Sequence, residues 1–153
     1  MAGFEMDFPE DFLSELLQTD ADDICFEALQ ETAPILENNM KDILRQDNHE
    51  LSGELIDSIK ATKPKKAKNG AWMVHVRPTG YSSINSFSVK GKGEKMRKYK
   101  ISNSLKMIWI EYGVAGRQPA RPFLQRLVNQ TRSASMTKMQ EVYNRKTGAR
   151  DES

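Results

Sequence analysis

An amphipathic stretch from Ala21 to about Gln46 constrains the fold of this chain more than any other part of its sequence. Apolar residues recur along it at helical spacing, and acidic side chains occupy much of the remaining surface. The apolar members are Ile24, Ala28, Ile35, Leu36, Met40, Ile43 and Leu44. Such a stripe is stable only when another element covers it, so the pattern predicts a long helix that packs on the rest of the chain. Pro34 lies inside the stretch and predicts a bend.

One shorter helix is expected on each side of this stretch. Before it, apolar residues recur at helical spacing between Phe8 and Leu17, within an N-terminal arm of residues 1–19, and Asp20 is placed to cap the long helix. After it, residues 53–60 predict a short helix with Ser52 as its N-cap.

Strands are expected in the middle of the chain. Residues 72–77 alternate, which predicts a half-buried strand ended by Pro78. One face would carry Trp72, Val74 and Val76, and the other Met73, His75 and Arg77. Residues 84–89 and 95–101 predict a hairpin, because the glycines of the KGKG segment between them suit a turn.

The C-terminal third predicts mainly helix. Residues 103–112 fit either a helix capped by Asn103 or Ser104 or a strand. A final helix is expected after Pro122 and should end at Gly148, with a flexible tail over residues 149–153. Its apolar face would be formed by Phe123, Leu127, Val128, Met139, Val142 and Tyr143.

The order of these elements predicts a single α+β domain over residues 1–153. The N-terminal helices and the C-terminal helix are expected to pack on a small antiparallel β-sheet that carries a basic hairpin.

Composition argues against several functional classes. The sequence holds no apolar run long enough for a membrane span, and its acidic start is unlike a signal peptide. Cys25 is the only cysteine, which fits a reducing compartment and a small buried side chain. His49 and His75 are far apart in sequence and suggest no metal site. No nucleophile or paired-carboxylate motif stands out, so we expect neither an enzyme nor a bound cofactor.

The net charge of +2 conceals an uneven distribution. Residues 1–57 hold sixteen acidic and two basic residues, a balance of −14, whereas residues 58–153 hold five acidic and 21 basic residues, a balance of +16. Three interpretations remain open. The basic half could bind an anionic partner, oppositely charged faces of two copies could attract each other, or the two halves could neutralise each other within one fold.

The predicted hairpin concentrates positive charge. Its basic residues are Lys90, Lys92, Lys95, Arg97, Lys98 and Lys100, with Glu94 as the one acid among them. These residues form a candidate basic contact arm. A solvated arm and a path for phosphate groups would use the same side chains.

Residues 111–123, which we call the elbow, are unlike the rest of the chain. Two glycines, two prolines and two arginines lie there between an apolar segment and the start of the final helix. The triplet Glu111–Tyr112–Gly113 and the run ARPFL at residues 120–124 resemble the tail-completion (neck) proteins of long-tailed bacteriophages. The segment from Gly53 to Ile59 and the strand at residues 72–78 resemble the same family, and the likeness extends over most of residues 21–148.

The resemblance implies a structural virion protein without catalytic activity. It would be assembled in the host cytoplasm and located in the phage neck, where it would form a homo-oligomeric ring that completes the tail. Six-fold symmetry is favoured for this ring, with twelve-fold symmetry as the alternative. Its partners would be the head connector and a tail-tube or tail-terminator protein, and genomic DNA would pass through the ring without sequence readout. No membrane is implied.

The elbow is the expected interface in such a ring. The interface residues would be Glu111, Tyr112, Gly113, Arg117, Pro119, Arg121, Pro122 and Phe123. The prolines would hold the arginines in a fixed orientation, which lowers the entropy lost on docking. Arg121 could bind Glu111 of a neighbouring copy. Alternatively, it could bind Glu111 of its own chain, and this internal staple would only fix the elbow.

The main alternative is a non-enzymatic nucleic-acid-binding module. In this interpretation the basic half would contact phosphates, and Trp72, Tyr81, Phe87 and Tyr99 would stack on bases. Within the ring interpretation, a further hypothesis places an acidic helix face along the channel, where it would repel DNA and let it slide.

Overall fold

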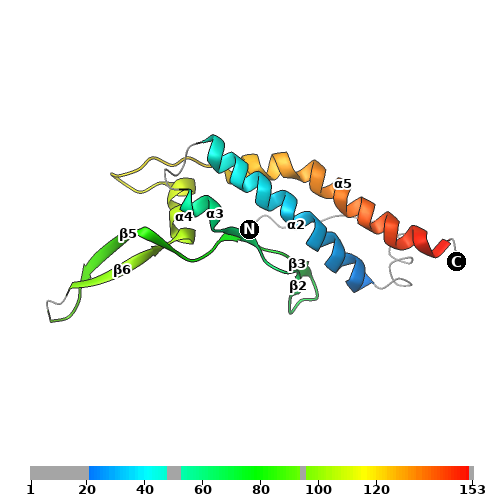
Figure 1. Ribbon diagram of the computed structural model, residues 1–153, viewed down its shortest axis with the longest axis horizontal. Coiled ribbons are helices and arrows are strands. Elements are labelled where there is room, and N and C mark those ends of the chain that lie inside the picture. Colours follow the sequence, from blue (N-terminus) through cyan, green and yellow to red (C-terminus); the bar gives the residue numbers. More distant parts are fainter. Residues whose placement is uncertain (1–20, 48–52, 94–95, 152–153) are drawn as a thin grey trace.

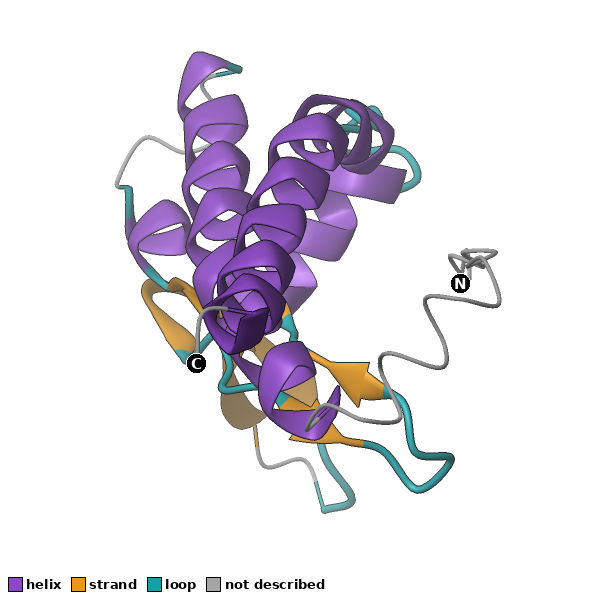
Figure 2. Cartoon of the chain, turned by 90° about the vertical axis from the view of Figure 1, so that its right-hand side faces the viewer, coloured by secondary structure: helices purple, strands orange, loops and turns teal. Residues whose placement is uncertain are grey.

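The computed structural model describes residues 21–47, 53–93 and 96–151. Two long helices, α2 (Ala21–Gln46) and α5 (Leu124–Asp151), run antiparallel and side by side, and the strands and short helices lie along one side of this pair (Figure 1). Seen from the end, the helices lie mainly on one side and the strands on the other (Figure 2). The predicted α+β class is confirmed. The N-terminal helix near residues 8–17 and the caps at Asp20 and Ser52 fall outside the described residues.

Helix α2 spans the predicted residues and continues on both sides of Pro34. Its buried residues are Ile24, Ala28, Thr32, Ala33, Met40, Ile43 and Leu44. Thr32 therefore belongs to the buried stripe, which the apolar pattern alone did not show, because it lies four residues after Ala28. Ile35 and Leu36 are only partly buried.

The segment after α2 is less helical than predicted. Helix α3 covers Glu54–Asp57, and residues Ile59–Ala61 form strand β1, which pairs antiparallel with β4 (Val76–Pro78). The prediction of a helix through Lys60 is wrong, because Ile59 meets the core from a strand, where it pairs with Pro78.

The alternating segment forms two short strands rather than one. Strand β3 (Trp72–Met73) pairs with β2 (Lys65–Lys66), and β4 follows after a break at Val74 and His75. At this break the Thr62 hydroxyl accepts the His75 N–H at 3.0 Å, and the Thr62 N–H donates to the His75 carbonyl at 2.7 Å. The predicted burial is nevertheless confirmed, since Trp72, Val74 and Val76 are the less exposed residues.

The predicted hairpin is present as β5 (Tyr81–Lys90) and β6 (Met96–Ser102). Helix α4 (Asn103–Tyr112) follows directly, so the helical interpretation of this segment is correct. Its cap is Ser102, whose hydroxyl accepts the Leu105 N–H at 3.1 Å. Asn103 and Ser104, the predicted caps, instead donate to the Thr79 and Pro78 carbonyls and fasten the helix to the chain before the hairpin.

The core lies where five elements meet: the end of α2, α3, β1, the end of α4 and the start of α5. Its buried members are Met40, Ile43, Leu44, Leu55, Ile56, Ile59, Ile110, Phe123 and Leu127. Helix α5 then continues along α2 and passes through Gly148 to Asp151, so the predicted end at Gly148 and the tail beginning at residue 149 are wrong. A glycine weakens a helix by about 1 kcal/mol but does not by itself end it. Val128 is exposed, because the buried side of α5 is set by Leu127 and Thr131.

Candidate functional site

The elbow is a tight, protruding turn between α4 and α5 (Figure 1). Val114 and Gln118 form an isolated antiparallel bridge, and the Arg117 and Gln118 N–H groups both donate to the Val114 carbonyl. Farther along, the Arg121 N–H donates to the Ile110 carbonyl at 2.7 Å. These backbone bonds hold the elbow against the end of α4.

Gly113 is required at the point where α4 ends. Its φ of 76° and ψ of 179° belong to a region that only glycine adopts readily. A Cβ atom at this position would lie 2.6 Å from the Ala120 nitrogen and 2.8 Å from the Gln118 oxygen. Because Gly113 has no Cβ atom, the backbone of Gln118 and Ala120 can pass close to the end of α4.

Glu111 caps the start of α5. One of its carboxylate oxygens accepts the Phe123 N–H at 2.9 Å and the Leu124 N–H at 3.3 Å. Phe123 itself is fully buried in the core. Sequence reasoning placed both residues in an interface, whereas the structure gives them internal roles. A partial signal was present, because α5 begins after Pro122 without a Ser, Thr, Asp or Asn immediately before it, which leaves its first N–H groups open to a side chain from elsewhere in the chain.

The other elbow residues lie at the surface. Tyr112 is 73% exposed, and Arg117, Pro119, Arg121 and Pro122 are exposed as well. An open depression is lined by Tyr112, Val114, Ala115, Gly116, Arg117, Gln118 and Pro119. Exposed apolar side chains continue on the adjoining helices at Ile108 of α4 and at Leu124 and Val128 of α5.

Arg121 makes no ion pair with any residue that the structure describes. Its predicted partner within the chain, Glu111, is occupied by the backbone N–H groups of α5. The internal staple between the two side chains is therefore not formed, and the Arg121 guanidinium remains available for contact with another molecule.

The β5–β6 hairpin projects away from the helices as an arm (Figure 1). Its strand pairing gives this arm two faces with different side chains. Side chains directly opposite each other in an antiparallel pair share a face, and successive residues alternate. Phe87 lies opposite Tyr99, and Val89 lies opposite Arg97. The two rings stack with their centroids 5.5 Å apart and their planes at 24°. We call this side the aromatic face of the arm; Phe87, Val89 and Tyr99 remain 44 to 46% exposed.

The opposite side carries hydroxyl and ammonium groups. Ser86 lies opposite Lys100, Ser88 opposite Lys98, and Lys90 opposite Met96. We call this side the lysine face. The residues of the predicted contact arm thus lie on an exposed hairpin, except that Lys95 lies outside the described residues; Arg97 lies on the aromatic face.

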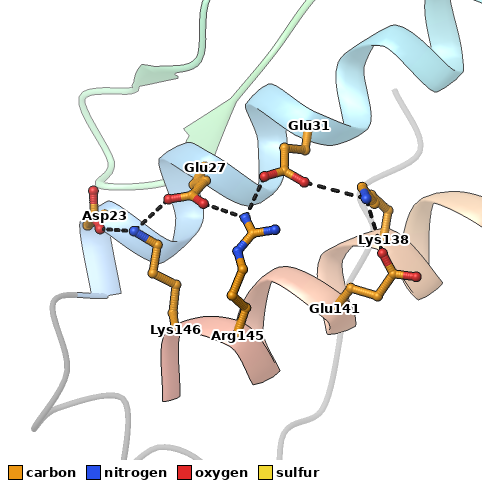
Figure 3. A network of polar contacts seen from close by, with 7 residues as sticks. All are labelled: Asp23, Glu27, Glu31, Lys138, Glu141, Arg145 and Lys146. Carbon is orange, nitrogen blue, oxygen red and sulfur yellow. Dashed lines mark hydrogen bonds and ion pairs between the residues drawn. The ribbon is translucent and has the colours of Figure 1, made fainter. Parts of the chain in front are cut away.

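Much of the acidic charge of α2 is paired with α5. Arg145 binds Glu27 and Glu31, Lys146 binds Asp23 and Glu27, and Lys138 reaches Glu31 at 3.6 Å (Figure 3). Hydrogen bonds, chiefly the one from Lys146, lower the pKa of Glu27. Hydrogen bonds, chiefly the one from Arg145, lower the pKa of Glu31. The bonds of Lys146 to Asp23 and then Glu27 raise the pKa of that lysine. Mutual neutralisation within one fold, one of the three interpretations of the charge distribution, therefore accounts for this part of the chain.

Asp22 extends the same pairing to the β2–β3 hairpin. Its carboxylate accepts hydrogen bonds from the Lys66 ammonium and from the Trp72 indole N–H, and these bonds lower its pKa. Trp72 also packs edge-on against Phe26. Trp72 is thus bound to α2 and does not join Tyr81, Phe87 and Tyr99 in a base-stacking surface. The acids of α2 at residues 22, 23, 27 and 31 are thus all paired with cations of the same chain.

The described part of the chain offers no metal-binding cluster. No group of three or more His, Cys, Asp or Glu side chains there could hold a metal ion. None of the described helices is both long enough and apolar enough to cross a membrane.

Comparisons with models of protein families, with curated proteins and with solved structures gave no significant match to this chain.

Proposed function

We propose that this protein is a non-enzymatic structural component of the neck of a long-tailed bacteriophage. In this proposal, copies of the chain form a ring that joins the head connector to the tail-tube or tail-terminator protein, and DNA passes through its centre. The proposal starts from the sequence resemblance at the elbow and at residues 53–78. The α+β fold supports it, because helices, strands and elbow follow one another in the order from which the resemblance was inferred.

The observation that carries the proposal is the aromatic face of the arm. Phe87 and Tyr99 stack on each other on a hairpin that projects from the body, and almost half of each side chain stays exposed. A monomer gains little stability from such an arm, since an isolated two-stranded hairpin is marginal in water. Contiguous exposed apolar surface on a soluble protein is typical of a protein–protein contact.

A ring needs two different surfaces on each copy, because a head-to-tail contact joins unlike patches. The chain has two such candidates. One is the arm, and the other is the elbow with Tyr112 and the exposed apolar residues Ile108, Leu124 and Val128. The elbow is rigid, since backbone hydrogen bonds fix it at Val114 and Arg121, and a rigid surface loses less entropy when it docks.

The exchange of Arg121 for alanine tests the elbow. We expect Arg121→Ala to fold normally, because its guanidinium pairs with no described residue, and to lose ring formation. Circular dichroism measures folding, and mass photometry with electron microscopy measures assembly. The matched control is Arg45→Ala, which removes an exposed arginine of α2 that pairs with Asp42 and lies outside the proposed surface.

Two results would contradict the proposal. A loss of helical signal in Arg121→Ala would show that this arginine supports folding rather than assembly. A density map of the intact particle that places this chain outside the junction of head and tail would overturn the proposed function itself.

A further inference from the structure

The basic residues of the described chain differ in whether they form ion pairs, a difference that the sequence does not show. On α5 and β2, cations bind acids of the N-terminal half: Lys66 with Asp22, Arg126 with Asp47, and Lys138, Arg145 and Lys146 with acids of α2. On the arm, Arg97, Lys98 and Lys100 form no ion pair with any described residue. Residues 81–93 and 96–102 contain no acid at all. Cations without an ion pair also lie elsewhere, among them Lys65, Lys68 and Arg121, but the described residues of the arm include no acid, so no described ion pair compensates the charge of Arg97, Lys98 and Lys100.

The lysine face arranges this charge in a regular row. Lys98 and Lys100 lie on the same face of β6, two residues apart, which separates their Cα atoms by about 6.5 to 7 Å. Ser88 and Ser86 lie directly opposite them on β5. Ammonium and hydroxyl groups both donate hydrogen bonds to phosphate oxygens, and together they account for many backbone contacts in protein–DNA complexes.

We infer that the lysine face binds the sugar-phosphate backbone of double-stranded DNA without reading its sequence. Its biological setting rests on the proposed function, in which DNA passes through the ring, but the contact itself requires only the arm. The aromatic rings lie on the opposite face and stack on each other, so the lysine face offers no platform for unpaired bases. It also lacks the planar guanidinium and amide groups that bind a base edge through two hydrogen bonds in a fixed geometry.

This assignment changes the role of charge within the proposed ring. Three α2 acids that could have repelled DNA, Asp23, Glu27 and Glu31, are bound to α5, whereas the lysine face remains positive. Contacts made by individual lysines to phosphates are weak and strongly screened by salt, so they can hold DNA near a surface and still let it move along.

The experiment measures the binding of the full-length protein to two DNA duplexes of unrelated sequence by fluorescence anisotropy over a range of salt concentrations. The variant is Lys98→Gln with Lys100→Gln. The matched control is Lys65→Gln with Lys68→Gln, which removes the same charge from two exposed lysines of the β2–β3 hairpin. Each phosphate contact contributes about −0.9 to the slope of log affinity against log salt. We expect equal affinity for both duplexes and a slope that becomes shallower by about 2 in the arm variant only.

Several outcomes would overturn the inference: no binding by the wild-type protein, a marked preference for one duplex, or an equal change of slope in the control variant. Tighter binding to polyglutamate than to DNA would assign the lysine face to an acidic protein instead. Electron microscopy of the same samples separates this inference from the proposed function. Rings in the arm variant, together with its shallower slope, support the DNA contact. If the wild-type protein binds DNA but is absent from the particle neck, the proposed function is rejected, whereas the inferred contact between the lysine face and DNA is not.

Discussion

Gly113 shows how a single residue determines the shape of the elbow. It ends α4 and turns the chain so that Gln118 and Ala120 pass directly beside it. Gly116, three residues on, also has a positive φ, of 69°, but a Cβ atom added there would have no neighbouring atom within 4 Å. The two glycines therefore separate the strain of an unfavourable backbone conformation from the steric effect of close packing.

We predict that Gly113→Ala destabilises the protein more than Gly116→Ala. The first change adds both backbone strain, of about 1–3 kcal/mol, and a clash with backbone atoms that cannot move without opening the elbow. The second adds only the strain of a left-handed residue, about 1–2 kcal/mol. Urea unfolding followed by circular dichroism gives both free energies of unfolding. If both variants lose the same free energy of unfolding, the close approach of Gln118 and Ala120 to Gly113 does not contribute to stability.

Glu111 and Phe123 illustrate what a short motif reveals and what it conceals. The run from Glu111 to Phe123 was recognisable as an unusual segment, and the structure does use it as one unit. The pattern did not show that Glu111 binds backbone N–H groups or that Phe123 enters the core. Both facts depend on how α4 and α5 approach each other, which is a tertiary relation that no local spacing contains.

At the scale of elements, the root of the arm is fastened by one carboxylate. Glu54 of α3 accepts the Ser83 N–H at 2.6 Å and the Ser82 hydroxyl at 3.0 Å, and Lys106 of α4 lies 3.5 Å away. These groups come from three different elements. The Ser83 N–H, above all, and the neighbouring hydroxyls and ammonium lower the pKa of Glu54 to about 2.

We predict that this contact makes stability depend on pH under acidic conditions. Because the pKa of Glu54 is lower in the folded state than its ordinary value of 4.5, its contribution is fully present above pH 4.5 and is lost as the pH falls towards 2. The difference in free energy of unfolding between the wild type and Glu54→Gln should shrink over this window. Denaturation at several pH values measures it. A difference that stays constant from neutral pH to pH 2 would contradict the assignment to the Glu54 charge.

The elements themselves were predictable to different degrees. Helix α2 followed from its long helical periodicity, and the β5–β6 hairpin followed from two strand-like segments joined by turn glycines. The boundary at residues 58–61 did not, since Ile59 fits both the spacing of a helix and the alternation of a strand, and its pairing with Pro78 decided between them. The end of α5 was also missed, because the α2 acids that bind Arg145 and Lys146 lie more than a hundred residues away in sequence.

At the scale of the whole molecule, the arm differs from the rest of the described chain, which we call the body. The difference lies in how much apolar and charged surface stays exposed. In the body, apolar residues from five elements form one core. Acids near the start of α2 pair with cations near the end of α5, and Asp47, just after α2, pairs with Arg126 near the start of α5. On the arm, the aromatic face and the lysine face both remain open to solvent. Folding of one copy therefore leaves the aromatic face and the lysine face of the arm exposed. Substitutions on these faces should affect assembly more than stability.

We predict that Phe87→Ser with Tyr99→Ser leaves the body folded and abolishes ring formation. A stacked aromatic pair contributes about 0.5–1.5 kcal/mol beyond the area that it buries, and neither ring belongs to the core, so the thermal midpoint should fall by only a few degrees. The matched control, Ser86→Ala with Ser88→Ala, changes the other face of the same hairpin and should still form rings. Thermal unfolding by circular dichroism and particle size by mass photometry measure the two effects. Because both variants keep the arm, rings formed by the aromatic variant would exclude its aromatic face from the contact between copies, and a large fall of its thermal midpoint would mean that the arm is part of the folded body after all.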